Sequence, residues 1–544
     1  MNFKKDSLFS GVCVVLFTWG AYFSLLWLRM FQSTNEGISV ASRLVWSDWA
    51  CHFTYAGVFA YRSVENWFEQ HPLFYGHAYD YPFLVNMVSG LLMRLGLGLT
   101  TSFVLPSIIC SYAMLLISFN FFKDILGTNK KAFTALSLFL MSGGMGFCYF
   151  LIDWCSNPSF LTFFFPPREY ALLHQSNIQW PNVVASEFLP QRAILLGFPI
   201  ALYVITKIYN WEKYNWMNTK NTNIFLVGAF SSILIITHIH SFMVLFFTFS
   251  LWFILDLRHY RKWILFASGT ILPSVFLIWF FHRTSDSGGF FRWYPGWMSN
   301  PTEGHPPSFL LFWWINWGFF LPFSLFASYR NKTLSHPVYL AGLLLFLLCN
   351  LIKFQPWAWD NTKILTYSYL FMCFPIASML VDLWKKNEVL YSVAALLMFI
   401  TITASGGLEL IRLLNANKLR QSMWRSEEIK LAEDFRALSK TDSIVLTSDQ
   451  HHHWVATLTG RQILMGYAGW LSSYGIDYTN RKNEIEHIFK GLEDASTLLR
   501  KYQVNYVVIG PSEINDYHAN EDYFKRLYPL ALSSEHYRVY QIKK

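Results

Sequence analysis

The sequence predicts a mainly α-helical, polytopic membrane protein with about 11–13 transmembrane helices, followed by a small α/β domain. Of the 544 residues, 53% are hydrophobic and only 14% are charged, whereas soluble domains carry roughly 25% charged residues. Apolar runs long enough to cross a bilayer, such as Leu8–Leu28 and Val389–Leu408, recur along most of the chain. The C-terminal stretch instead alternates in the short periods of strands and amphipathic helices.

The apolar runs give a set of candidate membrane spans. They cover residues 8–29, 82–99, 102–121, 132–152, 190–208, 223–240, 241–256, 263–281, 308–328, 337–352, 364–383 and 389–408. Segment 82–99 is the weakest, because it opens with Pro82 and contains Asn86 and Arg94. Without it, about eleven crossings remain, and all the short basic loops fall on one side, which the positive-inside rule makes cytoplasmic.

These basic loops also fix the expected orientation. They carry Lys4 and Lys5, Lys123, Lys130 and Lys131, Lys207, Lys213 and Lys220, Arg258, Arg261 and Lys262, Arg330 and Lys332, and Lys385 and Lys386. The N-terminus is then cytoplasmic, and the C-terminal domain is extracytoplasmic, which in a bacterium means the periplasmic side of the inner membrane. The first span is longer than a signal-peptide core and shows no cleavage site, so we expect it to be retained. The net charge of +9 does not indicate nucleic-acid binding, because these loops account for much of it.

We predict two domains. Residues 1–412 form the transmembrane domain, in which 30–102 are a first outer loop with interfacial helices, and residues 413–544 form the soluble α/β domain. Within the latter, the pattern predicts helices over 424–438 and Asn483–Tyr502. It predicts strands over Ser443–Thr447, Val504–Ile509 and Tyr537–Ile542.

The first outer loop holds the candidate catalytic residues. On a helix, Asp48, His52 and Tyr55 share one face, because they are spaced i, i+4, i+7. Asp80 follows in an aromatic and proline-rich segment that ends at Pro82. A carboxylate just outside the first span can act as a general base at a membrane surface. The alternative is that Asp48 only caps an interfacial helix.

A second set of residues gathers at the outer ends of spans and suits a phosphate. An arginine fork can pair with two phosphate oxygens. The set comprises Glu187, Arg192, His238, His240, Arg292, Asp360 and Lys363, with Arg283 and His305 in the same loop as Arg292. Together they would bind the phosphate or diphosphate of a polyprenyl-linked sugar. The alternative for each residue is an interfacial anchor or a snorkelling cation.

The order of these features resembles the GT-C superfamily of membrane glycosyltransferases, which includes protein O-mannosyltransferases, aminoarabinose transferases and oligosaccharyltransferases. The resemblance implies a polyprenyl-phosphate-linked sugar donor and makes Asp48 the catalytic base or acceptor-orienting group. Metal-dependent members use a paired acidic motif, which Ser47-Asp48-Trp49 lacks, so participation of a divalent cation stays open. The segments Gly466–Trp470 and Tyr506–Glu513 resemble the C-terminal region of large GT-C-like membrane proteins of bacteria and archaea.

The histidine run His451–His453 could bind a metal, but adjacent histidines do not share a face on a regular element. We therefore expect a solvated loop there. The sequence also lacks a Walker A loop, a Gly-x-Gly-x-x-Gly turn and a Gly-x-Ser-x-Gly motif, which argues against ATP-driven transport and a Rossmann nucleotide-sugar site.

We therefore predict a glycosyltransferase that moves a sugar from a polyprenyl-phosphate or -diphosphate carrier to a glycan, lipid or protein acceptor on the outer face, with inversion. Asp48 would deprotonate the acceptor, and Arg192, Lys363 and Arg292 would neutralise the leaving phosphate. One alternative is a secondary transporter or flippase of lipid-linked sugars, which would need charged residues inside spans and repeated halves. The other is a non-catalytic assembly protein with the same fold.

Overall fold

The computed structural model describes residues 8–214, 216–281, 291–299 and 308–542. The chain forms two compact units. The first combines Met1–Met30, Ser107–Leu277 and Phe291–Leu419, and the second combines Phe31–Pro106, Ile278–Phe290 and Arg420–Lys544. The boundary predicted between residues 412 and 413 stays a prediction, because compactness alone does not show which segments fold independently.

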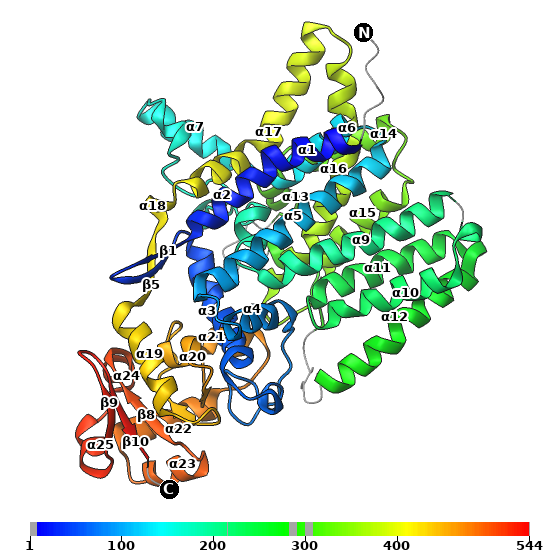
Figure 1. The fold of residues 1–544 in the computed structure, drawn as a ribbon. Helices are drawn as coiled ribbons and strands as arrows, with labels where there is room; N and C mark the ends of the chain where they lie inside the picture. The colour runs from blue at the N-terminus through cyan, green and yellow to red at the C-terminus, as the bar shows by residue number, and fades with distance from the viewer. Residues whose placement is uncertain (1–7, 215, 282–290, 300–307, 543–544) are drawn as a thin grey trace. The chain divides into compact units, whose positions relative to one another are not determined.

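The first unit is built almost entirely of helices (Figure 1). They are α1 (Leu8–Val15), α2 (Ala21–Met30), most of α5 (Leu99–Leu126), α6 (Asn129–Leu140), α7 (Gly146–Ser156), α8 (Leu161–Phe164), α9 (Arg192–Tyr214), α10 (Asn221–Ser231), α11 (Ile239–Leu255), most of α12 (Tyr260–Phe281), α13 (Phe309–Trp317), α14 (Phe320–Arg330), α15 (Pro337–Leu351), α16 (Thr362–Trp384), α17 (Val389–Leu414) and α18 (Ala416–Leu419). Two short strands, β3 (Arg292–Trp293) and β4 (Ile352–Lys353), pair antiparallel.

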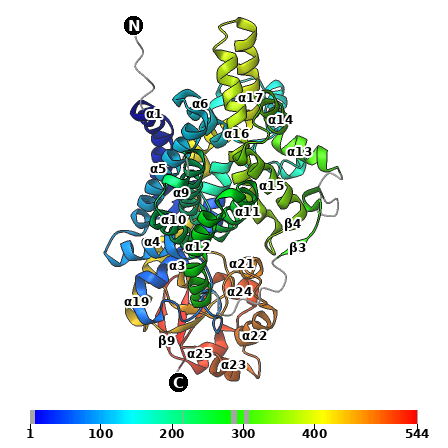
Figure 2. The ribbon, with the colours of Figure 1, turned by 90° about the vertical axis from the view of Figure 1, so that its right-hand side faces the viewer.

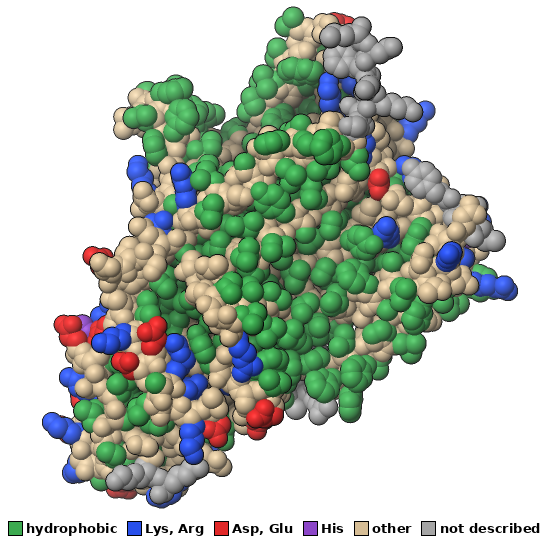
Figure 3. Space-filling view, in the orientation of Figure 1, with side chains coloured by type: hydrophobic (Ala, Val, Ile, Leu, Met, Phe, Trp, Pro, Cys, Tyr) green, Lys and Arg blue, Asp and Glu red, His purple; other side chains and the backbone are tan. Residues whose placement is uncertain are grey.

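Helices α16 and α12 show the two environments of this unit. Protein buries 89% of the most apolar window of α16, but only 17% of that around α12. Helix α16 runs beside α17 in both ribbon views (Figures 1 and 2). On α12, Ile271, Leu272 and Val275 are exposed, and hydrophobic side chains cover the visible face of the α9 to α12 region (Figure 3). Outward-facing apolar side chains on hydrogen-bonded helices are what a lipid environment requires.

The helices make the chain an integral membrane protein of mainly α fold, as predicted. Among the described residues, six helices are long and apolar enough to cross a membrane, and the pair α13–α14, bent by 87°, would make a seventh span. Four further helices are also apolar but shorter: Leu84–Arg94, Asn221–Ile235, Ile239–Leu255 and Pro337–Leu351. The count of about eleven crossings needs shorter helices to cross as well, and it stays a prediction.

The predicted span 132–152 is wrong as a single helix. Helix α6 ends at Leu140 and α7 begins at Gly146. Between them, a Cβ on Gly144 would lie 2.4 Å from the backbone oxygen of Asn316. The Asn316 side chain in turn accepts hydrogen bonds from the backbone N–H groups of Gln179 and Trp180, at 2.6 and 2.8 Å. The helix is interrupted where only glycine allows so close a backbone approach.

In its described residues, the second unit contains two sheets together with helices. Its elements are β1 (Phe31–Thr34), β2 (Gly37–Val40), α3 (Arg43–Tyr61), α4 (Leu84–Arg94), β5 (Gln421–Arg425), α19 (Ser426–Leu438), β6 (Ile444–Leu446), α20 (Trp454–Leu458), β7 (Gln462–Ile463), α21 (Ala468–Ser473), α22 (Thr479–Lys490), α23 (Ala495–Lys501), β8 (Tyr506–Ile509), α24 (Pro511–Tyr517), α25 (Glu521–Leu527), β9 (Leu530–Ser533) and β10 (Arg538–Gln541). The antiparallel sheet β1-β2-β5 joins the first outer loop to the C-terminal segment.

The larger sheet has the order β7-β6-β8-β10-β9. Strands β7, β6 and β8 are parallel, and β10 runs antiparallel to β8 and β9. This confirms the predicted α/β character of the C-terminal region, including the strands at β6, β8 and β10 and the helix at α19. The helix predicted over Asn483–Tyr502 is instead two helices, α22 and α23, which are separated between Lys490 and Ala495.

Candidate functional site

Helix α3 carries the candidate catalytic residues of the first outer loop. Ser42 caps its start, with the Oγ accepting from the backbone N–H of Val45 at 3.3 Å, which satisfies one free N–H of the first turn. From Trp49 to Ala60 every residue is buried. Asp48 is half-buried in the second turn. The alternative in which Asp48 caps the helix is therefore wrong, because Ser42 occupies that position.

Tyr55 lies on the same face of α3 as Asp48, seven residues further along the helix, and it contacts the segment that contains Asp80. The hydroxyl of Tyr55 lies 2.8 Å from Nε2 of His71, and Nδ1 of His71 accepts from the backbone N–H of Leu73 at 3.3 Å. Burial, helped by neighbouring His77, lowers the pKa of His71 to about 3. The ring is therefore neutral and carries its proton on Nε2, which donates to Tyr55.

Asp80 lies beside this pair. Its Oδ1 is 3.7 Å from Nε2 of His71, and its Oδ2 is 4.0 Å from Nδ1 of His77. Because His71 is neutral, the first approach is a polar contact and not an ion pair. Burial raises the pKa of Asp80, and His77 opposes that shift. The raised pKa favours the protonated, uncharged form of this acid, and its catalytic role stays a prediction.

The thiol of Cys51 on α3 and the hydroxyl of Tyr474 from the C-terminal segment extend this group toward Asp48. Sγ of Cys51 lies 3.2 Å from the hydroxyl of Tyr474. Burial raises the pKa of Cys51 to about 12; the bond to Tyr474 opposes the shift and the charge of Asp48 adds to it. Asp48 is thus close enough to interact electrostatically with the thiol. The cluster is completed by Tyr81, whose ring stacks on Tyr55 at 4.2 Å and packs near Tyr474 at 5.4 Å.

His52 takes a different direction from Asp48 and Tyr55. It is 2% exposed, and its Nδ1 lies 3.1 Å from Oδ1 of Asn86 on α4. Since the amide oxygen can only accept, Nδ1 donates. The contact ties α3 to α4. The catalytic role predicted for His52 stays a prediction.

The second group of candidate residues lies in the first unit, at the starts of α9, α11 and α16. His238 caps α11 through Nδ1, which accepts from the backbone N–H of Ser241 at 3.3 Å and lies 2.7 Å from the Ser241 hydroxyl. That hydroxyl is 2.5 Å from the hydroxyl of Tyr367 on α16. With Nδ1 accepting, the proton of a neutral ring is on Nε2. Among the described residues, no hydrogen-bond partner faces this buried nitrogen.

His240 and Lys363 adjoin His238. The rings of His238 and His240 are 5.3 Å apart, and Lys363 is near enough to both to interact electrostatically. The side-chain nitrogen of Gln355 lies 2.5 Å from Nε2 of His240, so the amide donates and the ring accepts. Lys363 pairs with Asp360 at 2.9 Å. The structure therefore brings four of the predicted phosphate-binding residues into one neighbourhood.

Glu187 and Arg192 flank the start of α9. Glu187 is buried in a π-helical turn (Val184–Phe188) and accepts from the hydroxyl of Thr362, the first residue of α16, at 2.9 Å. Arg192 is 1% exposed and interacts electrostatically with Cys110 on α5. One turn further, a Cβ on Gly197 would lie 2.5 Å from Cβ of His238. Glycine here lets α9 pass close to the start of α11.

Arg292 stands apart from these residues. It is exposed on β3, pairs with Lys353 of β4 and lies 5.7 Å from the Tyr294 ring centroid. Its predicted role stays a prediction. Arg283 and His305, which were predicted in the same loop, lie outside the described residues.

The histidine run is not the solvated loop that the sequence predicts. His452 and His453 are buried, and Nε2 of His452 lies 2.6 Å from the backbone oxygen of Trp46. His453 caps α20 through Nδ1, and its Nε2 approaches Glu513 Oε1 at 3.1 Å. In the part of the chain that the structure describes, no three His, Cys, Asp or Glu side chains are arranged to hold a metal ion. Participation of a divalent cation therefore finds no support among the described residues and stays a prediction.

Sequence reasoning missed several members of both groups. His71, Cys51 and Tyr474 belong to what we call the Asp48 cluster, together with Asp48, Tyr55, Asp80 and Tyr81. Ser241, Tyr367 and Gln355 belong to what we call the His238 group, together with His238, His240, Asp360 and Lys363. His71 had a local signal, since it lies in the aromatic and proline-rich segment. Tyr474 had none, because 423 residues separate it from Cys51 along the chain.

Comparison with known proteins identifies the fold. No protein-family model and no curated protein sequence matches the chain. The solved structure of ArnT from Cupriavidus metallidurans bound to undecaprenyl phosphate matches with a TM-score of 0.53 and 10% identity, covering 97% of each chain. The apo oligosaccharyltransferase from Archaeoglobus fulgidus matches at 0.47 with 11% identity, covering 97% of this chain and 73% of its own. At this level of identity the likeness concerns the fold alone: the chain has the fold of ArnT, and its membership of the GT-C superfamily stays a prediction.

Proposed function

We propose that the protein is a membrane glycosyltransferase that moves a sugar from a polyprenyl-phosphate or -diphosphate carrier to an acceptor on the extracytoplasmic face. The observation that carries the proposal is the likeness to ArnT, which was solved with undecaprenyl phosphate, over 97% of both chains. Two features of this chain support it: an acid beside a cluster of neutral polar groups, and a buried group of cations and donors at helix starts.

The His238 group suits the phosphate of the donor. A buried N–H without an acceptor carries a free-energy cost until an acceptor arrives, and a phosphate oxygen would satisfy Nε2 of His238. Lys363 and Arg192 add positive charge, which stabilises the charge that develops on the leaving phosphate. The starts of α9, α11 and α16 contribute the positive ends of their helix dipoles.

The Asp48 cluster suits the acceptor. In the proposed step, the carboxylate of Asp48 takes the proton of an acceptor hydroxyl or amine while the acceptor atom attacks the anomeric carbon. The bond between that carbon and the phosphate oxygen breaks, and its electron pair stays on the phosphate. Attack opposite the leaving group inverts the anomeric centre, through an oxocarbenium-like state. The hydroxyls of Tyr55 and Tyr474 and the thiol of Cys51 offer neutral hydrogen-bonding groups beside the acid.

The test uses the full chain reconstituted in nanodiscs with a pool of polyprenyl-phosphate-linked sugars and candidate acceptors. Mass spectrometry follows release of free polyprenyl phosphate and the mass gained by the acceptor. Asp48→Asn should lower turnover by about 10²–10⁴-fold, the usual contribution of a general base, while carrier binding is kept. Asp516→Asn, an exposed acid on α24, is the matched control and should turn over normally.

Normal turnover by Asp48→Asn would contradict the assigned base. Absence of transfer, combined with counterflow of lipid-linked sugars in liposomes, would instead favour the transporter alternative. Carrier binding with neither transfer nor counterflow would favour the non-catalytic alternative.

A further inference from the structure

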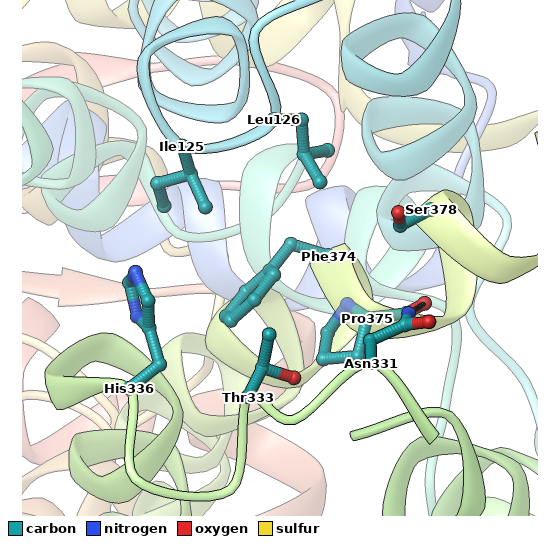
Figure 4. Close-up of a pocket in the computed structure, with 8 residues that line it drawn as sticks. All are labelled: Ile125, Leu126, Asn331, Thr333, His336, Phe374, Pro375 and Ser378. Carbon is teal, nitrogen blue, oxygen red and sulfur yellow. Dashed lines mark hydrogen bonds between the residues drawn. The ribbon is translucent and has the colours of Figure 1, made fainter. Parts of the chain in front are cut away.

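A cavity of about 320 Å³ opens in the first unit, where three elements meet. Its apolar wall comes from Ile125 and Leu126, at the end of α5, and from Phe374 and Pro375 on α16. In Figure 4, Phe374 lies between His336 and Ser378, with Ile125 and Leu126 on one side and Thr333 on the other. The connection between α14 and α15 supplies Thr333 and His336.

This cavity is separate from the His238 group. Lys363 is at the start of α16, and Ser378 lies about 22 Å further along that helix at ~1.5 Å per residue. The two sites therefore occupy opposite parts of one membrane-type helix. The loops around the cavity are the basic ones that the positive-inside rule makes cytoplasmic. That rule accounts for the charge of these loops, but it does not account for a cavity among them.

His336 in the lining of the cavity, and Lys131 beside it, carry hydrogen-bond donors. Nδ1 of His336 accepts from the backbone N–H of Val338 at 3.3 Å. Burial, with a smaller effect from Lys213, lowers the pKa of His336 to about 4. The ring is therefore neutral, with its proton on Nε2, and the hydroxyl of Tyr209 lies 3.4 Å from that nitrogen. On the other side, Ser378 Oγ is 2.8 Å from Nζ of Lys131.

Positive charge outweighs negative charge around the cavity. The charged side chains of the surrounding segments include Lys123, Lys130, Lys131, Lys213, Arg330, Lys332, Lys385 and Lys386, against Asp124 and Asp382. Lys131 pairs with Asp382 at 2.8 Å, but the Asp382 side chain is 49% exposed. An ion pair of this exposure contributes little to stability, so a second anion can share Lys131 at little cost.

We propose that this cavity binds the headgroup of an anionic phospholipid. Its phosphate would accept from His336 Nε2 and Lys131 Nζ, and its glycerol and first methylenes would lie against Ile125, Leu126 and Phe374. The cavity lies where membrane-type helices end and their loops begin, which is the depth of a headgroup. Basic pockets between transmembrane helices on the cytoplasmic side are a known way to recognise such lipids. This inference does not depend on the proposed function.

The test is native mass spectrometry of the delipidated full chain, titrated separately with phosphatidylglycerol, phosphatidylcholine and water-soluble glycerol 3-phosphate. The wild type should retain phosphatidylglycerol at least about tenfold more tightly than phosphatidylcholine. His336→Asn keeps a helix-capping side chain but removes the Nε2 donor, and Lys131→Met removes the cation. Each should weaken phosphatidylglycerol binding by about tenfold, the loss expected for one charge-assisted hydrogen bond.

Two matched controls test whether the effect belongs to this cavity. Lys386→Met removes an exposed lysine that stacks on Tyr391, and His487→Asn makes the same exchange at an exposed histidine of α22. Neither should change phosphatidylglycerol binding. If His336→Asn does not give a monodisperse protein, Lys131→Met carries the test.

Equal retention of both phospholipids, or equal losses in the controls, would overturn the proposal in favour of unspecific annular lipid. Binding of glycerol 3-phosphate as tightly as phosphatidylglycerol, with the same dependence on His336, would overturn the lipid assignment and make the site one for a soluble phosphate ester.

Discussion

The Asp48 cluster and the His238 group satisfy their buried polar atoms in different ways. In the second unit, Tyr55 binds His71 and Cys51 binds Tyr474, so the hydrogen bonds close within the protein. In the first unit, the described residues leave Nε2 of His238 without an acceptor, next to the cation of Lys363. A closed network needs no ligand for stability, whereas an open donor beside a cation favours an anion. The first arrangement suits a neutral acceptor, and the second suits a phosphate.

The largest expected effect is on stability, at a buried charge of the second unit. Glu513 accepts from the backbone N–H groups of Ser448 and Gly510, at 2.8 and 3.0 Å, and faces His453. Glu513→Gln breaks this network and should cost about 3–5 kcal/mol of unfolding free energy, measured by thermal unfolding. Carrier binding by the folded fraction should not change. The exposed control Glu493→Gln should stay within about 0.5 kcal/mol.

The same residue predicts behaviour in acid. Burial would raise the pKa of Glu513, but His453 and the N–H of Ser448 outweigh it and lower the pKa to about 2. The stabilisation is therefore present above the unfolded-state pKa of about 4.3 and is lost as the pH falls toward 2. Glu513→Gln should show a flatter stability profile in this window. An unchanged profile would mean that the charge of Glu513 does not stabilise the unit.

The next largest effect is expected on binding, at Arg192. Removing a charge-assisted hydrogen bond costs about 1.5–3 kcal/mol. Arg192→Ala should therefore weaken polyprenyl-phosphate binding by about 10- to 150-fold, as measured by native mass spectrometry. The exposed control Arg330→Ala should bind normally. Equal affinity of Arg192→Ala and wild type would remove Arg192 from the proposed donor site.

The substitution His238→Asn is the most direct test of the difference between the closed hydrogen-bond network of the Asp48 cluster and the open donor of the His238 group. Asparagine keeps a helix-capping side chain but removes the imidazole donor. We expect carrier affinity to fall by about tenfold, while the thermal stability of carrier-free protein stays about the same, because the asparagine oxygen can still accept from the backbone N–H of Ser241. His336→Asn should leave carrier affinity intact. A fall in carrier-free stability without a fall in affinity would make His238 a structural cap only.

A further dependence on pH concerns His71. Its folded pKa of about 3 lies below the unfolded value of about 6.5, so the unfolded state binds the extra proton between these values. Stability therefore falls as the pH is lowered through this window, by up to about 1.4 kcal/mol per pH unit. His71→Gln should flatten this slope by that amount in unfolding measurements at several pH values. The exposed control His487→Gln should leave the slope as it is in the wild type.

The sequence predicted the membrane-helix architecture and the α/β character of the C-terminal region, because hydrophobic period and length are local signals. It could not show that Tyr474 meets Cys51, or that His453 meets Glu513, because such pairings depend on tertiary packing. The sequence also could not predict that Nε2 of His238 is a donor without an acceptor among the described residues. That depends on which ring nitrogen caps the start of α11. The span 132–152 failed although Ser142-Gly143-Gly144 was visible, because apolar length outweighed two glycines in the pattern.

The β1-β2-β5 sheet has a consequence for biosynthesis. Nε1 of Trp46 donates to the backbone oxygen of Ser422 at 2.8 Å, across 376 residues of chain. At about 5–20 residues per second, a ribosome needs roughly 20–75 s to make that stretch. During this time, the first outer loop has already been translated without its strand partner and without the residues that bury α3. The second unit can therefore be completed only after the last membrane helix has been made. A folded second unit thus requires that all the preceding membrane helices have already been translated.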